Sequence, residues 1–141
     1  MRVENHATNG RSTKSFRDEG RWAAVYDKLQ PGDYVFIQFG HNDQKQNDST
    51  RYAAPERYAG NLRRYVRETR EKGAIPVLLT PIVRRRFADG LLDDTHGPYA
   101  DAVRRVAAAE GTQLIDAERL GLPSAIVMFT PGIWPWIDRS R

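Results

Sequence analysis

The chain has 141 residues, about the length of one domain, and 40% of them are hydrophobic. Its 22 basic and 18 acidic residues give a net charge of +4, which permits an anionic partner without requiring one. The sequence has no cysteine, which excludes a disulfide, a thiol nucleophile and a thiolate metal site and leaves the compartment open. We also expect no membrane span and no secretory signal, because no apolar run is long enough and the N-terminus has no apolar core segment.

The first third of the chain predicts a helix followed by a buried strand. Val3 is interpreted as the end of a short strand. Ser12–Leu29 has the spacing of an amphipathic helix, interrupted near Gly20. The apolar face of this helix carries Trp22, Val25, Tyr26 and Leu29. Tyr34–Phe39 is apolar almost throughout, as expected of a strand that is covered on both faces.

The middle of the chain repeats this order of helix and strand. Pro55 marks a helix start, Glu56–Lys72 has a helical apolar stripe, and Gly73 is a natural helix end. The stripe consists of Tyr58, Leu62, Tyr65, Val66 and Thr69. Ile75–Thr80 then predicts a second buried strand, which Pro81 closes.

A long loop, a helix and a short strand complete the pattern. Ile82–Gly97 exceeds the usual loop length of about 4–6 residues, and long loops over a sheet edge are often functional. Pro98–Glu110 predicts a third helix, and Gln113–Asp116 predicts a strand. The inward face of the helix carries Tyr99, Val103, Val106 and Ala107. This alternation predicts a three-layer α/β fold with a parallel sheet. Residues 117–141 break the pattern, so we expect a domain of residues 1–116 followed by a divergent tail.

Polar side chains follow the first buried strand immediately. Gly40 ends the strand, and His41, Asn42 and Asp43 come next. In open α/β sheets, ligands bind at the carboxyl ends of the strands. The Asn42 amide, held there out of water, is suited to stabilising a developing oxyanion, which indicates acyl-transfer chemistry.

A second polar turn, NHATNGRS, lies at Asn5–Ser12. Such a turn before a helix can direct backbone N–H groups at an anion, although a plain turn with Ser12 or Thr13 as helix cap explains the same residues. Together with FGHND at Phe39–Asp43, the N-x-A-x-x-G-R-S pattern resembles the SGNH (GDSL-type) hydrolases, and within them the rhamnogalacturonan acetylesterase-like branch. The resemblance extends from about Val3 to Asp116.

The resemblance implies a flavodoxin-like α/β esterase that removes O-acetyl groups from pectic polysaccharide without a cofactor. It also implies that the Gly10 N–H and the Asn42 side-chain amide are two oxyanion-hole donors. The family's nucleophilic serine lies in a G-D-S motif on its first strand, and its base lies in a D-x-x-H motif near the C-terminal end. Neither is found at those places here, so we expect an incomplete sheet that lacks the first strand and the C-terminal catalytic segment. We expect this chain to be inactive, and its unpaired strand edges to favour self-association.

Other residues are weak substitutes for the missing groups. Asp93 and His96 have the D-x-x-H spacing, but they precede the third helix, where the family has a similar D-T-H-G beside its true dyad. Ser12 and Ser15 are interpreted as a helix cap and a helix-surface residue. The three histidines have no metal-ligand spacing, so we interpret them as structural and expect no metal.

Three consecutive arginines, Arg84, Arg85 and Arg86, follow the second strand at the predicted site edge. Because guanidinium groups bind carboxylates through two hydrogen bonds, we predict that these residues bind galacturonate units of an acetylated acidic polysaccharide. We expect no nucleic-acid partner, because neither interleaved aromatic residues nor a recognition helix accompanies this charge. The alternative function is a non-catalytic carbohydrate-binding or pseudoenzyme domain that uses the same cleft.

Overall fold

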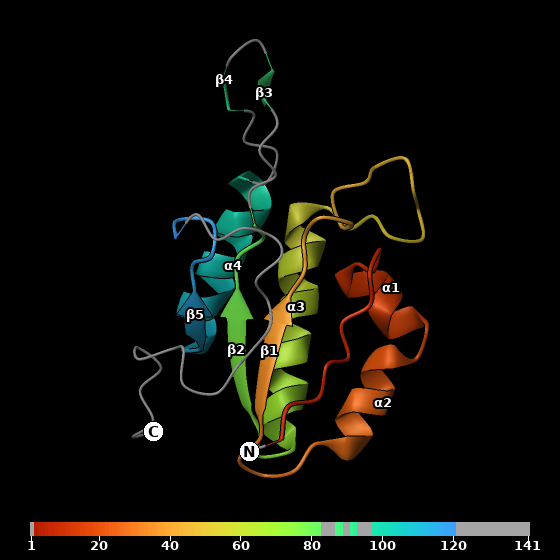
Figure 1. The fold of residues 1–141 in the computed structure, drawn as a ribbon, viewed down its shortest axis with the longest axis vertical. Coiled ribbons are helices and arrows are strands. Elements are labelled where there is room, and N and C mark those ends of the chain that lie inside the picture. The colour runs from red at the N-terminus through yellow and green to blue at the C-terminus, as the bar shows by residue number, and fades with distance from the viewer. Residues whose placement is uncertain (1, 83–86, 89–90, 93–96, 121–141) are drawn as a thin grey trace.

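A parallel sheet lies at the centre of the molecule. The computed structural model describes residues 2–82, 87–88, 91–92 and 97–120. Its central strands are β1 (Tyr34–Gln38), β2 (Ile75–Leu79) and β5 (Gln113–Ile115), which pair in the order β1-β2-β5 (Figure 1). Both pairings are parallel, and helices connect the strands, which confirms the predicted α/β class.

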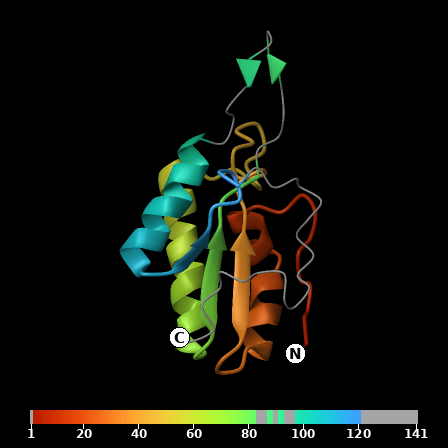
Figure 2. The ribbon, with the colours of Figure 1, turned by 60° about the vertical axis from the view of Figure 1, so that its left-hand side comes forward.

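The helices of the described residues are α1 (Thr13–Asp18), α2 (Arg21–Lys28), α3 (Pro55–Glu71) and α4 (Gly97–Glu110). Figures 1 and 2 show α3 and α4 against the sheet, with α1 and α2 beside α3. The predicted interruption near Gly20 is confirmed, because Gly20 has a left-handed backbone and separates α1 from α2. Among the described residues, no helix has the length and apolar character needed to cross a bilayer.

The main hydrophobic core lies between these helices and one face of the sheet. Ile37 and Leu78, which are neighbours in the β1–β2 pairing, supply the sheet side of this core. The opposite face carries a second cluster of Phe36, Val77, Leu79 and Ile115. The two clusters reflect the alternation of side chains along a strand. The predicted apolar helix faces are confirmed, since every hydrophobic residue assigned to them belongs to the main core or packs against it, and Thr69 is buried as well.

Two expectations about local structure are wrong. Val3 belongs to no strand: the segment around it is irregular, and Val3 itself is 52% exposed. A strand needs a hydrogen-bonding neighbour, and among the described residues this segment pairs with no strand of the sheet. The segment Ile82–Gly97, predicted to be a loop, contains two short strands: β3 (Phe87–Ala88) pairs with β4 (Leu91–Leu92) as an antiparallel hairpin.

Candidate functional site

The polar turn after β1 is fixed by a glycine that lies close to the next strand. Gly40 has φ +136°, and a Cβ atom there would lie 2.9 Å from Cγ of Pro81. The Tyr58 hydroxyl donates to the Phe39 carbonyl at 2.9 Å, and the Gln38 amide donates to the Thr80 carbonyl at 2.9 Å. These contacts tie the carboxyl end of β1 to α3 and to the carboxyl end of β2, so the turn lies at the edge where ligands bind in α/β sheets.

The structure brings the two predicted oxyanion donors to the same place. Nδ2 of Asn42 donates to the Arg11 carbonyl oxygen at 3.1 Å, across 31 positions of sequence. Gly10 directly precedes Arg11 and has a left-handed backbone with φ +78°. Among the described residues, no acceptor receives a hydrogen bond from the Gly10 N–H. A side-chain amide has two N–H donors, so Asn42 has a second one in addition to the one that it directs at Arg11, the residue after Gly10.

The next residue, Asp43, is buried and joins this turn to the start of α1. Its carboxylate accepts hydrogen bonds from the Thr13 backbone N–H at 3.1 and 3.2 Å and from the Thr13 hydroxyl. Burial raises the pKa of Asp43 to about 6, although the hydrogen bonds from Thr13 act in the opposite direction. The sequence pattern gave no sign of this contact, because the two residues lie 30 positions apart.

An ion cluster occupies the carboxyl ends of β2 and β5. Arg104 of α4 donates to both carboxylate oxygens of Asp116, at 2.9 and 3.0 Å, and also pairs with Glu118. The hydroxyl of Thr80 donates to the Asp116 carboxylate at 3.2 Å. Hydrogen bonding to Arg104 holds the pKa of Asp116 below its usual value. The Asp116 carboxylate is therefore occupied by structural contacts and is poorly suited to act as a general base.

Arg51 is a cation at the site that sequence reasoning missed. Its Nη1 atom lies 3.8 Å from the position that a Cβ atom of Gly10 would occupy. Its Nε atom pairs with Asp48 at 3.1 Å, and about a third of the side chain is exposed. It lies in an irregular loop without hydrophobic periodicity, so only its basic character could have drawn attention to it.

The remaining predicted residues do not join the two donors. Ser12 caps α1 and exchanges hydrogen bonds with Ser15, so the cap interpretation of Ser12 is confirmed. Ser15 is 6% exposed, so its assignment to the helix surface is wrong. His6 contacts Glu4 at 3.1 Å. The described part of the chain holds no group of three His, Cys, Asp or Glu side chains arranged for a metal ion. Outside the described residues lie Arg84, Arg85 and Arg86, and Asp93 and His96.

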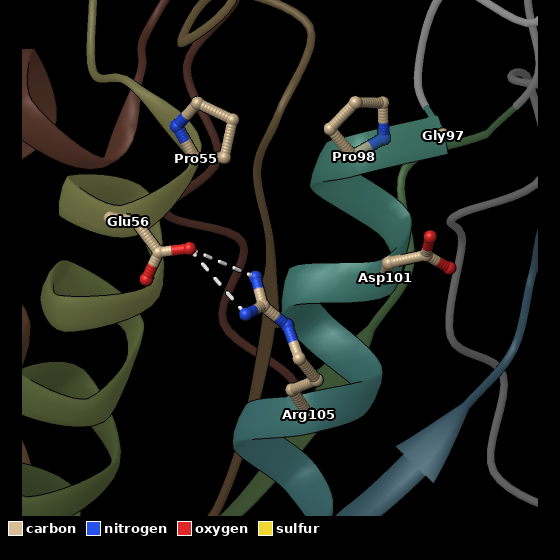
Figure 3. A pocket seen from close by; sticks show the side chains of 6 residues that line it. All are labelled: Pro55, Glu56, Gly97, Pro98, Asp101 and Arg105. Carbon is tan, nitrogen blue, oxygen red and sulfur yellow. Dashed lines mark hydrogen bonds and ion pairs between the residues drawn. The ribbon is translucent and has the colours of Figure 1, made fainter.

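An open pocket lies between the N-terminal ends of α3 and α4 (Figure 3). Its lining residues are Pro55, Glu56, Gly97, Pro98, Asp101 and Arg105. The Arg105 guanidinium spans the pocket and contacts Glu56 at 3.4 Å. None of the predicted site residues lines this pocket, so it is separate from the place where Gly10 and Asn42 meet.

Comparisons with known proteins show the family of the chain. Residues 1–134 match the model of the GDSL-like lipase/acylhydrolase family. The chain is 41% identical over 117 residues to the probable rhamnogalacturonan acetylesterase YesY of Bacillus subtilis, covering 82% of this chain and 54% of YesY. It is 42% identical over 115 residues to the rhamnogalacturonan acetylesterase RhgT of the same organism, covering 81% of this chain and 48% of RhgT. The chain thus spans about half the length of these curated relatives.

Solved structures show the same fold. The Bacillus subtilis protein YxiM superposes with a TM-score of 0.73 at 28% identity, over 84% of this chain and 33% of YxiM. Axe2, an acetylxylan esterase from Geobacillus stearothermophilus, superposes with a TM-score of 0.61 at 21% identity, over 78% of this chain and 51% of Axe2. The Axe2 likeness concerns the fold alone.

Proposed function

This chain belongs to the GDSL-like lipase/acylhydrolase family, and we propose that it supplies the oxyanion-stabilising part of a carbohydrate O-acetylesterase. The observation that carries the proposal is the hydrogen bond from Asn42 to the Arg11 carbonyl, which holds a side-chain amide beside the Gly10 N–H. Two donors from separate turns, on one sheet edge, suit an acyl group whose carbonyl oxygen gains negative charge. The similarity to two rhamnogalacturonan acetylesterases supports an acetylated pectic polysaccharide as substrate.

The chemistry assigned to these residues is the stabilisation of one charge. When a nucleophile adds to the acetyl carbonyl carbon, the electron pair of the C=O bond moves to the oxygen, and the N–H groups of Gly10 and Asn42 donate to it. Collapse of this intermediate expels the sugar oxygen, which takes up a proton, and water then releases acetate from the nucleophile. The sequence contains no G-D-S motif and no histidine after His96, so we assign no nucleophile and no base to these 141 residues.

Arg51 extends the proposal from the acetyl group to the acidic sugar. Its guanidinium lies beside Gly10, and Asp48 holds its Nε atom. A guanidinium anchored on one side can present its remaining N–H groups to a galacturonate carboxylate next to the acetylated sugar. Arg84, Arg85 and Arg86 keep their predicted role in binding the same polymer.

The proposal is tested by acetate release from acetylated rhamnogalacturonan. A chimera is made in which the residues of this chain that match RhgT replace the corresponding span of RhgT. The rate of acetate release by this chimera is compared with that of its Asn42→Ala variant. Loss of one oxyanion donor is expected to lower kcat by about 10²–10³-fold. Asn47→Ala, in an exposed position of the same loop, is the matched control and should leave kcat unchanged. An active chimera that tolerates Asn42→Ala would overturn the proposal.

The alternative is a non-catalytic carbohydrate-binding domain that uses the same cleft, and experiments on the unmodified chain distinguish the two functions. In that alternative the chain binds acetylated acidic oligosaccharide by itself, and the chimera gains no activity from it. Isothermal titration of the chain with acetylated rhamnogalacturonan oligosaccharide measures this directly. Binding that is lost in Arg51→Ala, together with an inactive chimera, would replace the esterase proposal with the binding one.

A further inference from the structure

We propose that Asp43 is a positioning residue that holds the two oxyanion donors in register, by tying the start of α1 to the turn that carries Asn42. This inference rests on the proposed function, because it concerns the geometry of the same two donors. It differs from that function in assigning no contact with substrate to Asp43, which is 0% exposed. Asp43 acts through Thr13 on one chain segment and through its own backbone on the other.

Two connections run in parallel between the segments that carry the donors. Asn42 donates to the Arg11 carbonyl, and Thr13 donates from its backbone N–H and its hydroxyl to the Asp43 carboxylate. Gly10 lies three residues before Thr13, and Asn42 directly precedes Asp43. A single hydrogen bond leaves two segments free to pivot about it, whereas two connections fix their relative orientation. Asp43 therefore supplies the second constraint on where the Gly10 N–H points relative to the Asn42 amide.

The surroundings of Thr13 keep its hydroxyl proton directed at Asp43. Nδ2 of Asn61 donates to Thr13 Oγ1 at 2.9 Å, and the Tyr65 hydroxyl donates to the Thr13 carbonyl at 2.7 Å. A hydroxyl that already accepts from an amide has its own proton left to donate, and the Asp43 carboxylate receives it. Successive hydrogen bonds in a buried chain strengthen one another. The contact is thus fixed from α3 as well as from α1.

The backbone of Asp43 is held independently of its carboxylate. Its carbonyl accepts from the Ala53 N–H at 2.9 Å and from the Tyr99 hydroxyl at 3.4 Å. Asp43→Ala therefore removes every side-chain acceptor for Thr13 while these backbone contacts hold the turn, whereas Asp43→Asn removes the charge and keeps one accepting oxygen. This separation makes Asp43 a suitable residue for testing position apart from folding.

Nuclear magnetic resonance of the full chain tests the proposal without requiring turnover. The reporter is the backbone amide of Gly10, which is remote from Asp43 in sequence and is connected to it by the contacts of Thr13 with Asp43 and of Asn42 with Arg11. With the pKa of Asp43 raised to about 6 by burial, the Gly10 amide shift should titrate with a midpoint near that value. Asp43→Asn should abolish the titration and move the Gly10 signal, whereas Asp27→Asn, at an exposed acidic residue of α2, should leave both unchanged.

Other titratable groups near Asp43 are separable from it. Tyr58 and Tyr65 face it from α3, and Tyr99 faces it from α4. Burial raises the pKa of all three, that of Tyr99 to about 12, so they stay neutral in this range. Two histidines are also close in sequence: His41 lies in the same turn as Asp43, and His6 lies in the segment that carries Gly10. The titration should persist in His41→Gln and in His6→Gln.

A Gly10 signal that stays flat across roughly pH 4 to 8 in the wild-type chain would overturn the proposal, even if Asp43→Asn failed to fold. In the RhgT chimera, Asp43→Ala should lower kcat by up to about 10²-fold with KM unchanged, as expected for donors displaced by about 1 Å. Lower stability with unchanged kcat would mean a purely structural role and would also overturn it. An inactive chimera combined with a titrating Gly10 signal would remove the proposed function but leave the coupling of Gly10 to Asp43 intact.

Discussion

At the scale of single residues, the site depends on backbone positions that only small side chains permit. Gly40 combines a left-handed φ of +136° with a neighbour that a Cβ atom would meet at 2.9 Å, the ring of Pro81. The left-handed backbone and the close approach of Pro81 each disfavour a larger residue, and both act on the residue that starts the GHND turn. The stability of the chain and the placement of Asn42 therefore depend on the same position.

We predict that Gly40→Ala lowers the free energy of unfolding by roughly 1–3 kcal/mol, through backbone strain and the contact with Pro81. Gly60→Ala is the control. Gly60 lies in the middle of α3, is exposed, and has nothing within 4 Å of the added methyl group. It should gain up to about 1 kcal/mol from helix propensity. Urea unfolding of both variants measures the two changes in the free energy of unfolding, which should have opposite signs. Equal changes in the two variants would contradict the strain at Gly40.

At the scale of helices and strands, hydrophobic periodicity predicted more than any other signal. The helix expected at Glu56–Lys72 is observed at Pro55–Glu71, and the predicted strand Ile75–Thr80 is observed at Ile75–Leu79. Each buries the face that its spacing indicated. Contacts such as Asn42 with Arg11 and Arg104 with Asp116 could not be predicted in this way. The distance in space between these residues depends on how the helices and strands pack, and a single polar pair produces no periodic pattern in the sequence.

One such contact joins three helices. Glu68 of α3 accepts two hydrogen bonds from the Arg17 guanidinium of α1, at 3.1 and 2.7 Å, and one from the Trp22 indole of α2 at 2.7 Å. Burial alone would raise the pKa of Glu68, but the hydrogen bonds from Arg17 and Trp22 outweigh it and hold the pKa below the usual value. The carboxylate is therefore more stable ionised in the folded chain than in the unfolded one.

We predict that Glu68→Gln lowers the free energy of unfolding by about 1–3 kcal/mol at neutral pH. A folded pKa below the unfolded value of about 4.3 contributes stability that is present above that value and is lost as the pH falls through the folded pKa. The difference between wild type and variant should therefore shrink below about pH 4. Glu71→Gln, at an exposed contact with Tyr26 one turn further along α3, should change stability by less than about 0.5 kcal/mol. A pH-independent difference would contradict the assignment.

At the scale of the whole molecule, the described residues form one helical layer against a sheet whose outer strands each pair on one side. Within the part of the chain that the structure describes, β1 pairs with β2 alone, and β5 pairs with β2 alone. The donors Gly10 and Asn42 stand beside the end of β1, the strand at one edge of this sheet. An unpaired ladder edge is a template for another strand, so the edge next to the site is also the place where a further chain can add.

We therefore predict that the 141-residue chain self-associates through the outer edge of β1, and that sedimentation velocity over a dilution series detects this as a concentration-dependent size. Tyr34 starts the strand and is 39% exposed, so Tyr34→Lys places a charge on the edge with little cost in burial. If two copies pair through this edge, the two lysines face each other, and their repulsion raises the free energy of association by up to about 1 kcal/mol. This corresponds to roughly fivefold weaker association. Leu120→Lys makes the same kind of exchange at a residue that is 55% exposed and lies beyond β5, so it should leave association through β1 unchanged. A wild-type chain that is monomeric at every concentration would show that the edge of β1 is not the contact. Equal weakening of association by Tyr34→Lys and Leu120→Lys would show the same.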